Sequence, residues 1–201
     1  LGSDAVQCFT AVSPSLAQSE LEDCASLAEE WGLNWSHVET AEMDNAAYRI
    51  NDENRCFHCK SALMDVVEPI ACQQELTVVL GVNTDDLGDH RPGQSAAQER
   101  LARFPLVDAG FSKEDVIEHS KKLGLRTWDK PAAACLASRI PYGTQVSVSL
   151  LRRLDRAESA LKNLGFDQLR VRDYGEIARL EIDLDQLSRA VDLRAEIVEA
   201  V

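Results

Sequence analysis

The chain has 201 residues, of which 45% are hydrophobic, and a formal net charge of −13. This composition is typical of a globular domain with a buried core, and the negative charge disfavours non-specific binding to nucleic acid or anionic lipid. No apolar run approaches the roughly 20 residues that span a bilayer, and residues 1–12 lack the regions of a signal peptide. We therefore expect a cytoplasmic protein that binds neither nucleic acid nor membranes and keeps its six cysteines reduced.

The first part of the chain alternates predicted strands and helices. Residues 5–12 and 33–40 are strand candidates, separated by a helix that we expect to begin at Ser13–Pro14. A second helix is predicted over residues 57–73. The segment 76–83 is almost continuously hydrophobic, which favours a strand covered on both faces.

A further helix is predicted after residue 112. Ser112 and Asp115 form a capping box at its start, and Gly124 supplies its C-terminal stop. Alternating strands and helices predict the α/β class, with a mainly parallel, Rossmann-like sheet and helices on both faces. Ligands of such sheets bind beyond the carboxyl ends of the strands, where residues 81–94 are expected to lie.

The pattern changes after Gly143. A helix is predicted over residues 147–164, and two alternating runs flank Tyr174–Gly175, which favours a hairpin. We predict one domain over residues 1–143 and a small α+β domain over residues 144–201. The first residue is not Met and both ends lie inside predicted elements, so we expect the sequence to be cut at both ends.

Three of the six cysteines are candidate metal ligands. Cys56 and Cys59 lie at the start of a predicted helix, where positions i and i+3 share one face and the helix dipole favours thiolate. With Cys135 they would make a three-thiolate site suited to a 4Fe–4S cluster that has one open iron. Structural zinc would need two ligands besides Cys56 and Cys59, and the sequence does not clearly offer a second pair. We expect the remaining cysteines to be small buried hydrophobic residues: Cys8, Cys24 and Cys72.

Four segments together carry a resemblance to a known family: NRCFHCK (54–60), GVNTDDLGDHRPGQ (81–94), DKPAAACLASRIPYG (129–143) and LRVRDYGEIARLE (169–181). In this order they resemble the LarE family of ATP-dependent sulfur transferases, which are PP-loop ATP pyrophosphatases with an adenine nucleotide alpha hydrolase-like fold. The resemblance covers nearly the whole chain. It implies homo-oligomers and a small-molecule nucleotide substrate.

The resemblance also implies a reaction in the biosynthesis of the nickel-pincer nucleotide cofactor. ATP adenylates a carboxylate of pyridinium-3,5-biscarboxylic acid mononucleotide, pyrophosphate leaves, and sulfur then displaces AMP to give a thiocarboxylate. In one branch of the family the cysteine matching Cys135 gives up its own sulfur and becomes dehydroalanine. In the other, cysteines matching Cys56, Cys59 and Cys135 hold a 4Fe–4S cluster that carries an extra sulfide. Because all three are present, we favour the second branch.

Two arginines are candidate ligands for the nucleotide phosphate. Arg170 and Arg172 alternate along a predicted strand and so project from one face, which suits a two-guanidinium clamp that Ser138 and Arg139 could close. A solvated strand face is the alternative. Two acidic positions of the family match Glu158 and Glu181, for which an ion pair with arginine is the structural alternative.

Polar residues also follow the predicted strand 76–83. Asp85, Asp86 and Asp89 could bind Mg²⁺ on ATP or on the substrate phosphate, or they could serve as turn and helix-capping residues. We also predict that Gly81 and Asn83 contact the nucleotide.

The family's ATP-binding loop, a Ser-Gly-Gly-Val-Asp-Ser type segment, does not occur in the sequence. Such a loop binds phosphate through backbone N–H groups at a helix N-terminus. We expect it to precede Leu1 in a parent enzyme, so that the chain alone binds ATP poorly and is inactive.

Three alternatives stay open. Some PP-loop tRNA thiolation enzymes also join a CxxC motif to a distant cysteine around a 4Fe–4S cluster, although the negative charge disfavours tRNA. A non-catalytic zinc-binding module is a second alternative. In a third, Cys135 acts without a cluster and Cys56 and Cys59 form a redox pair.

Overall fold

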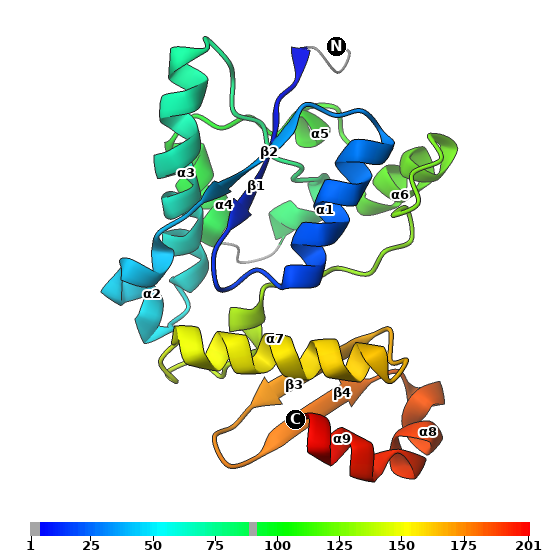
Figure 1. Ribbon diagram of the computed structural model, residues 1–201. Helices are drawn as coiled ribbons and strands as arrows, with labels where there is room; N and C mark the ends of the chain where they lie inside the picture. The colour runs from blue at the N-terminus through cyan, green and yellow to red at the C-terminus, as the bar shows by residue number, and fades with distance from the viewer. Residues whose placement is uncertain (1–4, 89–91) are drawn as a thin grey trace. The chain divides into compact units, whose positions relative to one another are not determined.

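The computed structural model describes residues 5–88 and 92–201 (Figure 1). By its internal contacts the chain divides into two compact units. The first comprises Leu1–Asp52 together with Ala134–Val201, and the second comprises Glu53–Ala133. The boundary predicted at residue 143 lies inside the first unit.

The first unit begins with a strand, a helix and a second strand. Strands β1 (Cys8–Val12) and β2 (Trp35–Glu39) pair in parallel, and helix α1 (Gln18–Glu30) connects them (Figure 1). A parallel pair needs such a crossover because its strands run in the same direction. The strand, helix and strand predicted for this segment are therefore confirmed.

Helix α1 begins later than the sequence suggests, at Gln18 rather than at Ser13–Pro14. The reason is that the serine hydroxyls between β1 and α1 form hydrogen bonds that hold a non-helical backbone. The hydroxyls of Ser13 and Ser15 lie 2.8 Å apart, and the hydroxyl of Ser15 donates to buried Glu42. These bonds hold the segment as a loop, as serine does where its side chain competes with the helical backbone.

A buried asparagine joins the two sequence segments of the first unit. Asn51 ends helix α2 (Ala46–Ile50) in a left-handed conformation, with φ 61° and ψ 49°, and is 0% exposed. Its side-chain amide donates to the carbonyl oxygens of Pro141 at 2.8 Å and Thr144 at 2.9 Å. Residues 140–144 are thereby held against α2, which explains why no unit boundary falls at residue 143.

The C-terminal part of the first unit is a helix packed on a hairpin. Helix α7 (Val148–Asn163) begins after Ser147, whose hydroxyl accepts the N–H of Leu150 at 3.2 Å. Strands β3 (Leu169–Asp173) and β4 (Ala178–Ile182) are antiparallel, and Gly175 in their turn has φ 83°. The predicted helix and hairpin are confirmed. The remaining elements of the unit are η2 (Glu42–Asp44), η4 (Leu136–Arg139), η5 (Leu184–Gln186), α8 (Leu187–Asp192) and α9 (Arg194–Ala200).

The second unit consists mainly of helices. Its elements are α3 (Arg55–Gln73), η3 (Thr84–Gly88), α4 (Pro92–Glu99), α5 (Pro105–Asp108) and α6 (Lys113–Lys122). Helices α3 and α4 approach closely at Gly93, where an added Cβ would lie 3.0 Å from the carbonyl oxygen of Cys56. The capping box of Ser112 and Asp115 is present, and Gly124 has φ 77° just beyond α6. The predicted helix and its stop are confirmed.

The strand predicted over residues 76–83 is reduced, in the described part of the second unit, to one parallel bridge between Val79 and Arg103. The partner segment is short, because Leu101 has a left-handed φ of 63° and Pro105 opens α5. The prediction that both faces are covered is wrong for Val79, which is 53% exposed.

The described strands form one parallel and one antiparallel sheet of two strands each. Together with the helices that connect and follow them, they confirm the α/β class. No helix among residues 5–88 and 92–201 is both long and apolar enough to cross a membrane.

Candidate functional site

Cys135 occupies the N-cap position of η4, with an extended backbone at φ −60° and ψ 155°. Its side chain is exposed, whereas Leu136 and Ala137, which follow it, are buried. The N–H of Leu136 donates to the carbonyl oxygen of Ser15 at 2.8 Å. The backbone is thus anchored in the first unit, beside the segment that follows β1, while the thiol is presented to solvent.

A buried ion pair lies directly beneath this segment. Arg139 and Glu158, on α7, form a bidentate pair with distances of 2.8 Å (Nε to Oε1) and 3.0 Å (Nη2 to Oε2). Both side chains are less than 10% exposed. The Nη1 of Arg139 donates to the carbonyl oxygens of Ala134 at 2.6 Å and Cys135 at 3.2 Å. The predicted alternative for Glu158, an ion pair with an arginine, is what the structure contains.

Arg172 links the Cys135 segment to the hairpin. Its Nη1 donates to the carbonyl oxygen of Ser138 at 3.1 Å, and its Nε donates to Glu181 at 2.8 Å. The hydrogen bond from Arg172 holds the pKa of the Glu181 carboxyl below its ordinary value, with smaller contributions from the charges nearby. Three of the predicted site residues are therefore in contact: Ser138, Arg172 and Glu181.

One face of the hairpin gathers positive charge. Arg170 lies opposite Glu181 in the ladder, and Arg172 lies opposite Arg179, so all four side chains share a face. Arg179 also contacts Glu181 at 3.3 Å. We call these four residues the arginine face. It carries three guanidiniums and one carboxylate, an excess of positive charge that suits a phosphate group.

Sequence reasoning missed Arg179. The hairpin register could have identified Arg179, because a turn at Tyr174–Gly175 places it opposite Arg172. The same alternation that singled out Arg170 and Arg172 would have selected Arg179 together with Glu181 on the returning strand.

Sequence reasoning also missed Glu42, a buried carboxylate near the carboxyl end of β2. It is 2% exposed, and its Oε1 accepts the hydroxyl of Ser15 at 3.1 Å. Its Oε2 has no hydrogen-bond partner among the residues that the structure describes. Nothing in the acidic segment around it distinguishes Glu42 from its exposed neighbours, so burial is visible only in the fold.

The acidic residues of the second unit cap backbone groups. Asp85 accepts the N–H of Lys113 at 2.8 Å, and Asp86 accepts the N–H of Asn83 at 3.1 Å. The side chain of Asn83 in turn accepts the N–H of Asp85 at 3.0 Å. The sequence allows two roles for these aspartates, Mg²⁺ binding or capping, and these bonds are capping bonds. Gly81 precedes this loop, and Asp89 lies outside the described residues.

Cys56 and Cys59 lie in the first turns of α3, as predicted, and Cys56 is exposed. They belong to the second unit and Cys135 belongs to the first, so the three-thiolate site draws on both units and stays a prediction. Within the described residues of either unit alone, no three His, Cys, Asp or Glu side chains are grouped as metal ligands.

The prediction that the other cysteines are buried is wrong for Cys72, which is exposed. Cys72 lies in the last turn of α3, where the helix ends before Glu75 adopts a left-handed φ of 55°. Cys8 and Cys24 are only half-buried.

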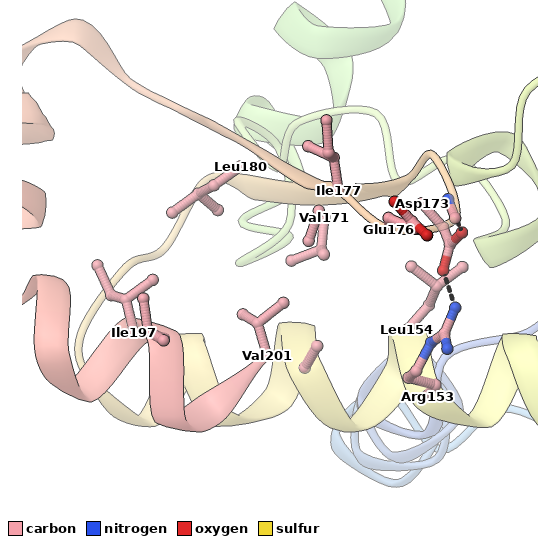
Figure 2. Close-up of a pocket in the computed structure, with 13 residues that line it drawn as sticks. Arg153, Leu154, Val171, Asp173, Glu176, Ile177, Leu180, Ile197 and Val201 are labelled. Carbon is pink, nitrogen blue, oxygen red and sulfur yellow. Dashed lines mark hydrogen bonds and ion pairs between the residues drawn. The ribbon is translucent and has the colours of Figure 1, made fainter.

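A pocket of about 570 Å³ lies between α7, the β3–β4 hairpin and α9 (Figure 2). Its lining is mostly aliphatic. At one end Arg153 pairs with Asp173, and Glu176 lies beside them. Because side chains alternate along β3, Asp173 and Val171 line the pocket from the face opposite the arginine face. The pocket therefore contains none of the predicted site residues.

Comparisons with known proteins identify three relatives. The chain is 47% identical over 192 residues to the uncharacterized protein slr1717 of Synechocystis, covering 95% of this chain and 71% of that protein. It is 33% identical over 183 residues to the pyridinium-3,5-bisthiocarboxylic acid mononucleotide synthase of Lactiplantibacillus plantarum, covering 90% of this chain and 66% of the synthase. It is 27% identical over 193 residues to the uncharacterized protein MJ0830 of Methanocaldococcus jannaschii, covering 73% of that protein. No protein-family model matches the chain.

Proposed function

Since the chain belongs to the same family as slr1717 of Synechocystis and is similar to a pyridinium-3,5-bisthiocarboxylic acid mononucleotide synthase, we propose that it takes part in sulfur transfer to a pyridinium carboxylate nucleotide. The substrate carboxylate attacks the α-phosphorus of ATP and pyrophosphate leaves, which gives an acyl-adenylate. Sulfur then attacks the acyl carbon, and AMP leaves with the electron pair of the broken C–O bond. The products are a thiocarboxylate and AMP.

In this proposal the arginine face binds the phosphate of the mononucleotide. Arg170, Arg172 and Arg179 place three guanidiniums on one face of the hairpin, and guanidiniums form strong charge-assisted hydrogen bonds with phosphate oxygens. Glu181 keeps Arg172 oriented, because the two are already hydrogen-bonded in the free chain. The hydroxyl of Ser138 lies on the segment that Arg172 holds, and we assign it to the same phosphate.

One observation carries the proposal: the contact of Arg172 with the carbonyl oxygen of Ser138, three residues after Cys135. It connects the segment of an exposed thiol with the arginine face within a single unit. Sulfur transfer to a nucleotide needs a phosphate-binding group near the sulfur, because the bound phosphate holds the substrate in place while the sulfur attacks the acyl carbon.

Cys135 is the proposed sulfur-delivering residue. We propose that Cys56, Cys59 and Cys135 would hold a 4Fe–4S cluster, because thiolates are the ligands that such clusters prefer. Cys56 and Cys135 are both exposed. When bound, the cluster would supply a sulfide for transfer. Without a cluster, Cys135 itself would lose its sulfur.

The proposal extends to the nucleotide-activating part of the enzyme. ATP and Mg²⁺ are the proposed cosubstrates, and β1 and β2 are proposed to belong to a larger, Rossmann-like parallel sheet. The backbone bonds of Asp85 and Asp86 support capping roles for these residues rather than roles as Mg²⁺ ligands.

Calorimetric titration with the substrate mononucleotide tests the binding part of the proposal. We expect the 201-residue chain to bind pyridinium-3,5-biscarboxylic acid mononucleotide at least about tenfold more tightly than the corresponding nucleoside, because the nucleoside lacks the phosphate. Equal affinity for both would contradict the proposal. Binding of tRNA with a steep dependence on salt would instead favour the tRNA thiolation alternative.

A further inference from the structure

The guanidinium of Arg139 contacts two different parts of the first unit. Its Nε and Nη2 are taken by the carboxylate of Glu158, at 2.8 and 3.0 Å. Its Nη1 lies within hydrogen-bond distance of the carbonyl oxygens of Ala134 and Cys135 and of the hydroxyl oxygen of Ser138. The side chain is 8% exposed. All three nitrogens of Arg139 are therefore engaged inside the protein.

The anchor of this arrangement is Glu158. It lies on the buried side of α7, and its Oε1 also accepts the backbone N–H of Val171, in the middle of β3, at 3.0 Å. A carboxylate fixed by a helix and by a neighbouring strand leaves the guanidinium little freedom to turn. Burial of a charged group costs desolvation free energy, and the hydrogen bonds and opposite charges of Arg139 and Glu158 offset this cost.

The second set of contacts determines where the thiol lies. The carbonyl oxygens that Arg139 holds are those of Cys135 and of the residue before it. On the other side of Cys135, the N–H of Leu136 is held by Ser15. The backbone on both sides of an exposed thiol is thus fixed, although the side chain itself is not packed.

We propose that Arg139 is a positioning residue, which fixes the backbone around Cys135 and does not bind the substrate phosphate. Its guanidinium faces the interior, whereas Arg170, Arg172 and Arg179 lie on the arginine face. The effect of this restraint on sulfur transfer rests on the proposed function. A thiol whose backbone is fixed loses less conformational freedom when its sulfur approaches the acyl carbon. The restraint on the backbone does not depend on that function.

Amide hydrogen exchange of the 201-residue chain tests the restraint directly. Arg139→Lys keeps a positive charge for Glu158, but a single ammonium cannot span both the carboxylate and the two carbonyl oxygens. We expect the amides of Leu136 and Ser138 to exchange about tenfold faster or more in this variant, while those of α7 and β3 stay within about twofold of the wild type. The matched control is Arg153→Lys, because Arg153 also forms an ion pair, with Asp173. It should leave the exchange rates of Leu136 and Ser138 unchanged.

If Arg139→Lys folds poorly, the double variant Arg139→Met, Glu158→Met removes both charges together and should show the same increase in exchange at Leu136 and Ser138. The amide of Val171 is left out of this comparison, because the double variant also removes its acceptor. Unchanged exchange at Leu136 and Ser138 would overturn the proposal. An equal increase throughout α7 and β3 would also overturn it, because the pair would then serve only overall stability.

A kinetic measurement separates positioning from phosphate binding. With the iron–sulfur-reconstituted chain, sulfide as the sulfur source and a preformed acyl-adenylate of the mononucleotide as substrate, Arg139→Lys should lower kcat for thiocarboxylate formation about tenfold or more and leave KM unchanged. An increase in KM with kcat unchanged would assign Arg139 to the phosphate instead. If the wild type forms no thiocarboxylate, the proposed function fails, while the exchange measurement still decides whether Arg139 restrains the Cys135 segment.

Discussion

Arg172 and Glu181 lie on neighbouring strands of the hairpin, and the Nε of Arg172 donates to the Oε1 of Glu181 at 2.8 Å. This hydrogen bond is the main cause that lowers the pKa of Glu181. Arg172→Gln should therefore raise the pKa of Glu181 toward the ordinary glutamate value, while Arg153→Gln should not change it. A carboxyl titration followed by NMR measures both, and an unchanged pKa in Arg172→Gln would contradict the assignment.

The sign of the pH effect on stability follows from the same shift. The pKa of Glu181 is lower in the folded chain than in the unfolded chain, so the pair stabilises the fold at neutral pH. This stabilisation is lost as the pH falls through the acidic range toward the lowered pKa. Glu181→Gln should show a smaller loss of unfolding free energy between pH 7 and acidic pH than the wild type, measured by urea denaturation at each pH.

Arg179 tests the arginine face, because sequence reasoning did not select it. Arg179→Gln should weaken binding of pyridinium-3,5-biscarboxylic acid mononucleotide about tenfold, the cost of one charge-assisted hydrogen bond. Arg153→Gln is the control, since Arg153 pairs with Asp173 on the other side of the hairpin. Calorimetry that gives equal affinities for both variants would remove Arg179 from the site.

Glu158→Ala tests the buried ion pair. The substitution leaves the Arg139 charge buried without its partner and removes the acceptor of the Val171 N–H. We expect the free energy of unfolding in urea to fall by about 3–5 kcal/mol. The double variant Arg139→Met, Glu158→Met should be clearly more stable than Glu158→Ala. A loss below about 1 kcal/mol in the single variant would show that the pair is not buried as described.

The sequence predicts the elements whose signals are local. The capping box of Ser112 and Asp115, the helix predicted over residues 147–164 and the turn at Tyr174–Gly175 each depend on neighbouring residues, and all three are confirmed. The segment 76–83 has the composition of a buried strand, but its pairing is limited by the left-handed Leu101. No local pattern could reveal that restriction.

In the candidate site, too, the sequence predicts local features but not those that depend on tertiary packing. Alternation along one strand correctly placed Arg170 and Arg172 on one face. The buried state of Arg139 and Glu42 depends on tertiary packing, which short-range spacing does not encode. The sequence neighbours of Arg139 therefore predict a contact with the substrate phosphate, whereas its contacts in the structure are with Glu158 and with the Cys135 backbone.

The cluster proposal predicts a specific set of cysteines. After anaerobic reconstitution with iron and sulfide, the wild type should bind iron and show the broad visible absorbance of a 4Fe–4S cluster. Single Cys56→Ser, Cys59→Ser and Cys135→Ser variants should each lose most of this absorbance. Cys72→Ser should retain it, because Cys72 lies at the far end of α3. Metal analysis that finds zinc and no iron would favour the zinc-binding alternative.

Sulfur transfer by the chain is the decisive experiment. The reconstituted chain is incubated anaerobically with sulfide and the preformed acyl-adenylate of pyridinium-3,5-biscarboxylic acid mononucleotide. The masses of the nucleotide products are then measured by mass spectrometry. We expect a thiocarboxylate, in which one oxygen is replaced by sulfur, from the wild type and from Cys72→Ser but not from Cys135→Ser. Thiocarboxylate formation by Cys135→Ser at the wild-type rate would contradict this expectation.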